Sequence, residues 1–554
     1  MIRLIPLVLL SLLIPFPGHS GPISDYICGE TNTLPESIES QSWQQVLAAL
    51  AEERTDSETE NGFEGSHTHR LSNGYSASLF YYIPKSYDPA EATPLLMTLH
   101  GGVSTFRSAP GKDVLPRWKE WADENGFIVA APSSNGNNPW WFREGEEHIL
   151  ESLRFLAANY HLDRNRVVLS GASDGATGTF SLGTRFTDLW SACLAWQGSY
   201  QVLTNASPLM GGVQPFFTRN AASIPWRITH GELDELYPGA SQTGAIKRLD
   251  RAGTKVDWEV HPGLGHDTVA TIEIEQPLLA SWLSGKERDP YPDLIDWTVI
   301  DPIRYGRAYW VRVNRLSQWK QDPFTDLPDL TVPVSKPRPT SAIFGIQFDR
   351  DYSGRGARVL GVANYSSAQS SGIRGGDIIV GVGDREIENL SDLQSAITGE
   401  ESESSQRTVR YLRDAGTYTA RFNLFPVKAP IPDHSQAGRI RVERSGNQIK
   451  IRTHQIGAFE VLISPEEFDL SQEVTISVQG NEKFRGMIRP DSVFMLDEMR
   501  ERSGDTASVY ARHHPTRRTR LRSRCLHGPT RYAPTTPRRQ SRVPASAGRI
   551  RSPR

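Results

Sequence analysis

The sequence contains little cysteine. Three cysteines occur in 554 residues, Cys28, Cys193 and Cys525, and their spacing fits no metal-binding pattern. Cys193 lies in the apolar run 192–196, which favours a buried thiol over the alternative, a disulfide with Cys28. Nothing in the sequence indicates a metal ion or an organic cofactor, and we expect none.

An excess of charge of one sign is also lacking. The formal net charge is −3 at pH 7, so we expect no nucleic-acid partner. The segment 506–554 is an exception, because it holds thirteen arginines and no lysine, aspartate or glutamate. Such a segment could bind nucleic acid or an anionic surface. Its abrupt change of composition favours instead a disordered basic tail or the translation of a shifted reading frame.

Long apolar runs are absent beyond the N-terminus. The run 4–16 follows Arg3, is too short to span a bilayer comfortably and precedes small residues at 18–20. This pattern predicts a signal peptide over residues 1–20, cleaved near Ser20, with an uncleaved anchor as the alternative. We therefore expect an exported protein that is periplasmic, extracellular or at the cell surface, without a stable transmembrane span after cleavage.

The chain is too long for a single hydrophobic core. A length of 554 residues predicts two to four domains. We interpret residues 21–70 as an N-terminal region with one helix near 43–50 and a linker over 57–66. From residue 71 to residue 285, apolar strand-like runs alternate with helical patterns. This alternation predicts a mostly parallel sheet with helices on both faces.

The clearest motif lies at residues 171–175, Gly-Ala-Ser-Asp-Gly, directly after the apolar run 167–169. A sharp turn from a strand into a helix strains the backbone of the central residue, here Ser173, and glycines on either side avoid collisions. Because Gly and Ser are common, such a pentapeptide also arises by chance. The motif therefore needs support from other residues.

That support comes from residues that follow other predicted strands. His100-Gly101-Gly102 follows the strand ending at Leu99, Asp234 follows the strand 225–229, and His266 follows the strand 256–260. Serine, aspartate and histidine in this chain order are typical of one large class of hydrolases. The pattern predicts a nucleophilic serine with a histidine base and an aspartate.

These motifs make residues 71–285 resemble the secreted α/β-hydrolases of the polyhydroxybutyrate-depolymerase, feruloyl-esterase and dienelactone-hydrolase-like group, within the prolyl-oligopeptidase-like superfamily. The matching segments cover most of the region: 100–102, 162–167, 171–175, 230–234 and 263–266. The resemblance implies an α/β-hydrolase fold. It implies a catalytic site but does not name the substrate.

The resemblance also assigns roles. Ser173 would attack the substrate, His266 would accept its proton, and Asp234 would orient the imidazole. Asp234 is preferred to its neighbour Glu235 and to Asp267, since it lies four residues beyond His230, as in the family. We expect His100 to be structural.

Two further features of the site are predicted. The backbone N–H groups of Asp174 and of Gly102 or its neighbour would form the oxyanion hole. The loop has two glycines where lipases have three, so the second donor is either Gly102 or its neighbour. Trp140 and Trp141 would form a substrate-facing wall, and an equally weighted alternative places them over the core.

A second resemblance covers residues 340–428. Residues 343–346, the glycine-rich stretch 370–384 and a predicted helix over 390–397 resemble a PDZ domain of the type found with bacterial proteases. The resemblance implies that the loop containing Phe344, Gly345 and Ile346 holds the C-terminal carboxylate of a protein ligand through backbone N–H groups. A purely architectural PDZ domain is the alternative.

The segments that flank this module, residues 286–335 and 436–500, are both rich in predicted strands. Neither segment has enough strands for a core of its own, so we predict a single β-sandwich-like domain interrupted by the PDZ module.

Together these features predict an exported serine hydrolase that cleaves carboxylic esters through an acyl-enzyme. A PDZ module would recruit or regulate it. The alternatives are a prolyl-oligopeptidase-like serine peptidase and a catalytically silent PDZ-bearing binding protein.

Overall fold

The computed structural model describes the chain in several ranges. These are residues 21–28, 31–53, 61–103, 110–135, 138–204, 214–318, 324, 326, 330–333, 346–349, 351–362, 367–398, 406–414, 416–423 and 436–501. The predicted signal peptide, the basic tail, Phe344 and Gly345 lie outside the described residues. Within the described part, no helix has the length and apolar character needed to cross a membrane.

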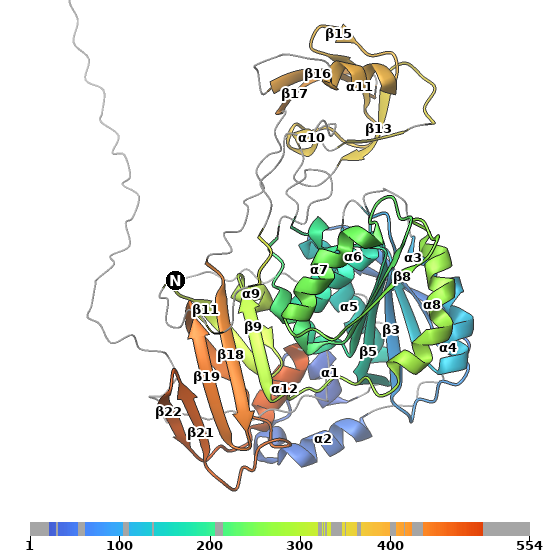
Figure 1. Ribbon diagram of the computed structural model, residues 1–554. Coiled ribbons are helices and arrows are strands. Elements are labelled where there is room, and N and C mark those ends of the chain that lie inside the picture. The colour runs from blue at the N-terminus through green and yellow to red at the C-terminus, as the bar shows by residue number, and fades with distance from the viewer. Residues whose placement is uncertain are drawn as a thin grey trace, which may run out of the picture.

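The largest unit is built on an eight-stranded sheet with the strand order β1-β2-β4-β3-β5-β6-β7-β8 (Figure 1). β1 and β2 pair antiparallel, as do β2 and β4, and every other neighbouring pair is parallel. The strands span Glu64–Arg70, Ser76–Tyr82, Thr93–Leu99, Ile128–Pro132, Leu162–Ala172, Ala192–Trp196, Trp226–Gly231 and Val256–His261, from β1 to β8.

Helices cover both faces of this sheet. α5 (Arg143–Asn159), α6 (Asp174–Arg185) and α7 (Gly239–Arg251) contribute to one apolar core, and α4 (Lys119–Asn125) and α8 (Thr268–Leu283) contribute to the other. Every residue of β3, β4, β6 and β7 is buried, as expected for parallel strands covered on both sides. This arrangement is the α/β-hydrolase fold that the sequence predicted.

The first strand of the sheet was not predicted. β1 pairs with β2 along its whole length, so residues 64–66 belong to the sheet and not to a linker, and the unit begins before residue 71. Within β1 only Gly65 and His69 are buried. An edge strand made of Glu, Gly, Ser, Thr, Arg and two histidines has no apolar alternation, and this is why the sequence pattern concealed it.

Buried histidines beside β1 make the stability of this unit depend on pH. Burial, together with the nearby His148, lowers the pKa of His69 to about 2, and burial lowers the pKa of His148 to about 4. Unfolded histidine titrates near pH 6.5, so each residue contributes stability above about pH 6.5 that is lost as the pH falls toward its folded value. For each histidine we expect a loss of about 2 kcal/mol between pH 7 and pH 5.

The substitution His69→Gln tests this expectation. It should make the free energy of unfolding fall less steeply between pH 7 and pH 5, as measured by urea denaturation at both values. His161 lies on the same unit and is bonded through Nδ1 to Pro89 O, so His161→Gln is a control. Equal pH dependence in wild type and His69→Gln would contradict the burial argument.

The two β-rich segments share their sheets. β9 (Leu294–Val299), which precedes the PDZ module, pairs with β18 (Gly438–Ser445), which follows it. β11 (Val311–Leu316) likewise pairs with β20 (Ile456–Val461). The five-stranded sheet β22-β21-β19-β18-β9 and the three-stranded sheet β10-β11-β20 enclose one apolar core that includes Trp297 and Trp310. The remaining strands are β10 (Arg307–Ala308), β19 (Gln448–His454), β21 (Val474–Val478) and β22 (Asn481–Gly486). Both segments therefore build one domain, which supports the hypothesis of an interrupted sandwich.

A helical cluster joins the two ends of the described chain. α1 (Pro22–Cys28) and α2 (Trp43–Glu52) pack against α12 (Ser492–Glu501), with Ile27, Val46 and Leu496 in a common core. The sequence analysis placed residues 436–500 wholly in the β-rich domain and did not anticipate α12. Its apolar side chains are buried by the N-terminal helices, which lie more than 400 residues away in the sequence.

The module between the two β-rich segments has its own sheet and core. Its strands β12 (Ile346–Phe348), β13 (Ala357–Val362), β14 (Ile378–Val382), β16 (Gln406–Arg413) and β17 (Gly416–Asn423) are neighbours in that order, and β15 (Arg385–Glu386) pairs with β14. α11 (Leu390–Thr398) contributes Leu393 to the core.

Candidate active site

Ser173 lies at the turn between β5 and α6 in a strained conformation, with φ 55° and ψ −118°. A Cβ atom on Gly171 would lie 2.1 Å from the carbonyl oxygen of Gly175, and one on Gly175 would lie 2.0 Å from that of Leu99. Side chains are therefore excluded on both sides of the serine. The close approach of α6 to the end of β3 is what demands the glycine at position 175, and the strain is typical of a functional site.

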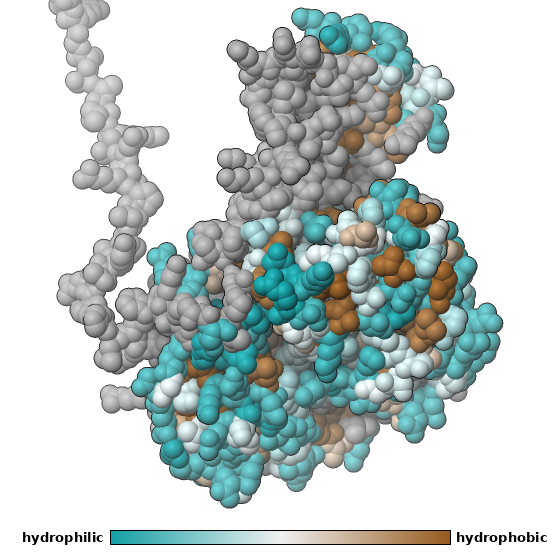
Figure 2. All heavy atoms as spheres, in the orientation of Figure 1, coloured by the Kyte–Doolittle hydropathy of each residue, from teal (hydrophilic) through white to brown (hydrophobic). Residues whose placement is uncertain are grey.

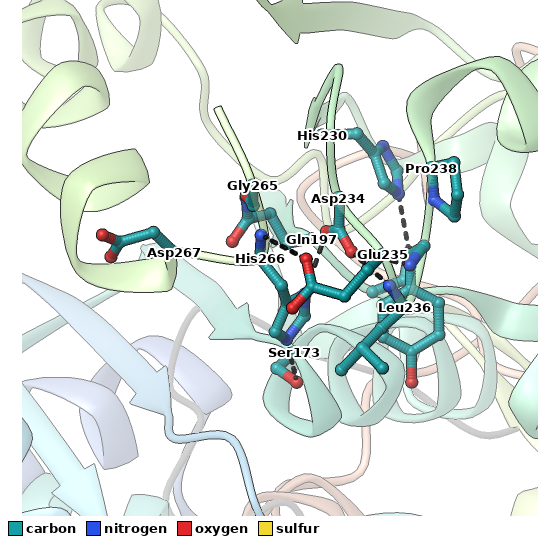
Figure 3. A network of polar contacts seen from close by, with 12 residues as sticks. Ser173, Gln197, His230, Asp234, Glu235, Leu236, Pro238, Gly265, His266 and Asp267 are labelled. Atoms are coloured by element: carbon teal, nitrogen blue, oxygen red, sulfur yellow. Dashed lines mark hydrogen bonds and ion pairs between the residues drawn. The ribbon is translucent and has the colours of Figure 1, made fainter. Parts of the chain in front are cut away.

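The structure brings together the three residues that the sequence predicted as a triad (Figure 3). His266 Nε2 lies 3.0 Å from Ser173 Oγ, and His266 Nδ1 lies 2.9 Å from Asp234 Oδ2. Each residue follows a different strand, β5 for the serine, β7 for the aspartate and β8 for the histidine. The Asp234 carboxylate is fully buried, and the His266 side chain is 13% exposed.

These contacts define the hydrogen bonds of the imidazole. Asp234 is a carboxylate, so the Nδ1–H group of His266 donates to it, and Nε2 is then the acceptor for the Ser173 hydroxyl. The other carboxylate oxygen of Asp234 accepts hydrogen bonds from the backbone N–H groups of Leu236 and Tyr237, at 2.9 and 2.7 Å. The carboxylate is therefore held in place from both sides.

The two other acidic residues near the triad, Asp267 and Glu235, form different hydrogen bonds. Asp267 accepts hydrogen bonds from the backbone N–H groups of Val269 and Ala270 and thereby caps α8. Glu235 accepts a hydrogen bond from the backbone N–H of His266, at 3.3 Å. The geometry thus separates Asp234 from both of them.

The loop that follows β3, residues 100–103, lies against Ser173 and is called the His100 loop. A Cβ atom on Gly101 would lie 2.9 Å from Ser173 Cβ, and Gly102 has a positive φ of 67°. His100 Nε2 accepts a hydrogen bond from the Ser134 N–H, so Nδ1 carries the proton and donates to Gly101 O at 2.7 Å. Both ring nitrogens are engaged in holding loops, which agrees with the structural role predicted for His100.

The Asp174 side chain has a contact that the sequence analysis missed. Its Oδ2 accepts a hydrogen bond of 3.0 Å from the backbone N–H of Val103. This buried bond connects the His100 loop to the elbow, the turn between β5 and α6 that carries Ser173. The backbones of Gly102 and Asp174 are therefore fixed near Ser173. Their role as oxyanion donors stays a prediction.

The predicted substrate wall is wrong for this conformation. Trp140 is completely buried and Trp141 is 3% exposed, and both belong to the core on one face of the sheet. The Trp140 indole N–H donates to the His100 carbonyl oxygen at 3.0 Å, and a Cβ on Gly178 of α6 would lie 2.5 Å from Trp140 Cβ. Trp140 therefore supports the His100 loop from below, as in the alternative that placed these residues over the core.

Apolar side chains are exposed on the loop that carries the aspartate. Leu233 and Leu236 are 65% and 61% exposed, and they flank Asp234 in the sequence. Figure 2 shows that apolar residues form small separate patches on the visible face of the molecule. The Tyr237 ring centre lies 5.7 Å from that of His266, and burial raises the pKa of its phenol, which therefore stays protonated.

Two further residues named in the sequence analysis can be placed. His230 is buried, its Nε2 lies 2.9 Å from the Gly198 carbonyl oxygen, and burial lowers its pKa, so it is a neutral support beside the triad. Cys193 is a buried free thiol, as predicted. Among the residues that the structure describes, no group of three or more His, Cys, Asp or Glu side chains could hold a metal ion.

An eight-stranded, mostly parallel sheet with a serine at a strand-to-helix elbow defines the class of this unit as an α/β-hydrolase. Comparisons with known proteins give the following similarities. An acetylxylan esterase of Coprinopsis cinerea is 28% identical over 143 residues, which are 23% of this chain and 36% of the esterase. The match thus spans about a third of the length of that relative.

Solved structures and a family model give the remaining findings. A thermostable esterase is 20% identical with a TM-score of 0.35, and the alignment covers 41% of this chain and 63% of the esterase chain. A ferulic acid esterase is 18% identical with a TM-score of 0.33, and the alignment covers 41% of this chain and 99% of the esterase chain. The family model of the PDZ domain matches residues 342–424, so the chain contains a PDZ domain within the range predicted for it.

Proposed function

We propose that this protein is a serine hydrolase that cleaves carboxylic esters through an acyl-enzyme on Ser173. The observation that carries the proposal is the hydrogen-bonded series from Ser173 Oγ through the His266 imidazole to the buried carboxylate of Asp234. A serine hydroxyl is a poor nucleophile at neutral pH, and a base within 3.0 Å is the arrangement that activates it.

The steps follow from the tautomer. Ser173 Oγ attacks the ester carbonyl while its proton passes to His266 Nε2, and Asp234 stabilises the resulting imidazolium. The negative charge on the former carbonyl oxygen would be met by the N–H groups of Asp174 and Gly102, each worth about 3 kcal/mol. His266 then protonates the departing alcohol. Water, deprotonated by His266, cleaves the acyl-enzyme and releases the acid.

The proposed bond is an ester and not a peptide. The acetylxylan esterase that resembles this chain over 143 residues, 36% of its own length, favours an ester of a small acyl group. A prolyl-oligopeptidase-like peptidase would use the same three residues, so the triad does not separate the two. The proposed substrate is therefore an ester, and a peptide is the alternative.

We further propose that the PDZ domain binds the C-terminus of a partner protein and that the enzyme is exported. In the described part of the domain, Ile346 begins β12 and pairs with Val362 of β13. The proposed carboxylate loop would precede this strand, at Phe344 and Gly345. A peptide that adds to a sheet edge gains main-chain hydrogen bonds there, which would recruit or regulate the hydrolase.

An assay with two substrate types tests the proposal. We expect hydrolysis of p-nitrophenyl acetate with saturation kinetics, and no comparable release of p-nitroaniline from peptide anilides. Peptide cleavage without matching ester turnover would favour the peptidase. A folded protein that binds C-terminal peptides but turns over neither substrate would contradict the enzymatic proposal and support a silent binding protein.

A further inference from the structure

The short loop that carries His266 is held at three successive residues. The carbonyl oxygen of Leu264 accepts a hydrogen bond from the N–H of Leu233, and the N–H of His266 donates to Glu235. Both partners belong to the loop that also carries Asp234. Between them, the carbonyl oxygen of Gly265 accepts a bond of 2.6 Å from the side-chain amide of Gln197. Gln197 follows β6, so this third contact comes from a different strand.

The position of Gln197 links the base to the nucleophile. The residue before it, Trp196, accepts a hydrogen bond from the backbone N–H of Ser173 at 2.9 Å. At the residue after it, Gly198, a Cβ atom would lie 2.6 Å from the carbonyl oxygen of Ser173. The backbone around Gln197 therefore packs directly against the elbow, while its side chain reaches the His266 loop (Figure 3).

The conformation of Gln197 is an unfavourable one. Its φ is 51°, a left-handed backbone that a side chain disfavours, and the residue is completely buried. Burying a carboxamide also costs free energy unless it is hydrogen-bonded. Among the described residues its Oε1 has no hydrogen-bond partner. The bond to Gly265 O is therefore the contact of this side-chain amide that offsets the cost of burying it. Strain of this kind concentrates at functional sites.

The orientation of the amide is determined by its partner. A carbonyl oxygen accepts and cannot donate, so the NH₂ group of Gln197 must face Gly265 O. The bond fixes the peptide unit that joins Gly265 to His266. It thereby acts on the position of the imidazole, whereas Asp234 acts on its tautomer and rotation.

We propose that Gln197 is a positioning residue that fixes His266 relative to Ser173 by holding the carbonyl of Gly265. The inference depends on the proposed function, because it assigns Gln197 to the same reaction. A misplacement of about 1 Å can lower the rate of an enzyme by about 100-fold. Loss of the amide should therefore slow the attack of Ser173 and leave substrate binding nearly unchanged.

The variant Gln197→Met tests this inference, because methionine has similar length and no N–H donor. The matched control is Gln214→Met: Gln214 is also buried in this unit, and its amide donates to Ser181 at 3.2 Å, away from the triad. Steady-state kinetics with p-nitrophenyl acetate should show kcat lowered by about 10- to 100-fold in Gln197→Met, with KM within about threefold of wild type. Gln214→Met should keep the wild-type kcat.

The time course of labelling by a fluorophosphonate separates positioning from mere destabilisation. Misfolding would lower the fraction of protein that labels, whereas a misplaced base lowers the rate constant while all of the protein still labels. We expect the rate constant of Gln197→Met to fall by about the same factor as kcat, at full amplitude. A wild-type rate constant, with or without reduced amplitude, would overturn the inference. Wild-type protein that neither labels nor turns over substrate would overturn the proposed function, and this inference with it.

Discussion

Replacing Ser173 with alanine is expected to abolish ester turnover, with a fall in kcat of about 10⁵-fold or more. The alanine retains the backbone of the elbow but removes the oxygen that lies 3.0 Å from His266 Nε2. Without this oxygen no acyl-enzyme forms, and any residual rate comes from binding of the ester near polarising N–H groups. The measurement is steady-state hydrolysis of p-nitrophenyl acetate by the purified variant.

A double variant shows whether the loss of activity comes from the loss of the Ser173–His266 pair. If Ser173 and His266 act as one unit, the double variant Ser173→Ala/His266→Ala should lose no more activity than Ser173→Ala alone. Ser170 lies on the same strand and is fully buried, so Ser170→Ala is the control for a general loss of structure. Turnover by Ser173→Ala near the wild-type rate would contradict the assignment of the nucleophile.

Replacing Asp234 with asparagine is expected to lower kcat by about 10⁴-fold. The N–H groups that bind one oxygen of Asp234 would hold the asparagine oxygen in the same place, so the NH₂ group would face His266 Nδ1, which must then be the unprotonated nitrogen. Nε2 then carries a proton and cannot accept the one from Ser173. The pair of N–H groups from Leu236 and Tyr237 would still bind one side-chain oxygen, so the fold should survive.

The control for this variant is Asp267→Asn. Asp267 is one residue from the imidazole in the sequence, but its carboxylate caps α8. Asparagine is also a good cap, so both stability and kcat should stay close to wild type. A fall in kcat for Asp267→Asn as large as that for Asp234→Asn would mean that the acid has been assigned wrongly.

The contacts among Ser173, Asp234 and His266 could be predicted from the sequence, because the residue types that the chemistry needs stand at positions set by local geometry. The glycines at 171 and 175, and the order Ser173, Asp234, His266, follow from the strained turn and from strands ending at one edge of a sheet. The catalytic roles stay proposals, while the contacts among the three side chains are those the motifs implied.

Tertiary contacts explain what the sequence concealed. Trp140 is an aromatic residue of the kind found on binding surfaces. Only its packing against α6 and the His100 loop shows that it is buried. Gln197 carries no sequence signal, because its strain and its bond to Gly265 exist only in the folded chain. Both β1 and α12 were missed, the first because it is polar and the second because its partners lie at the other end of the chain.

The interrupted domain shows a similar limit. The number of strands on each side of the PDZ module suggested one shared domain, since neither side was sufficient. The pairing itself could not be read from the sequence, because β9 and β18 are separated by the whole inserted module. Register over such a separation is set by burial of Trp297 and Ile440 in the common core.

The most direct test of the central claim is to locate a covalent adduct. Wild-type protein is treated with a fluorophosphonate, digested and examined by mass spectrometry, beside Ser173→Ala treated in the same way. The account predicts one modified site, on Ser173, and no adduct in the variant. A folded wild-type protein without an adduct, or an adduct on another serine that persists in Ser173→Ala, would contradict it.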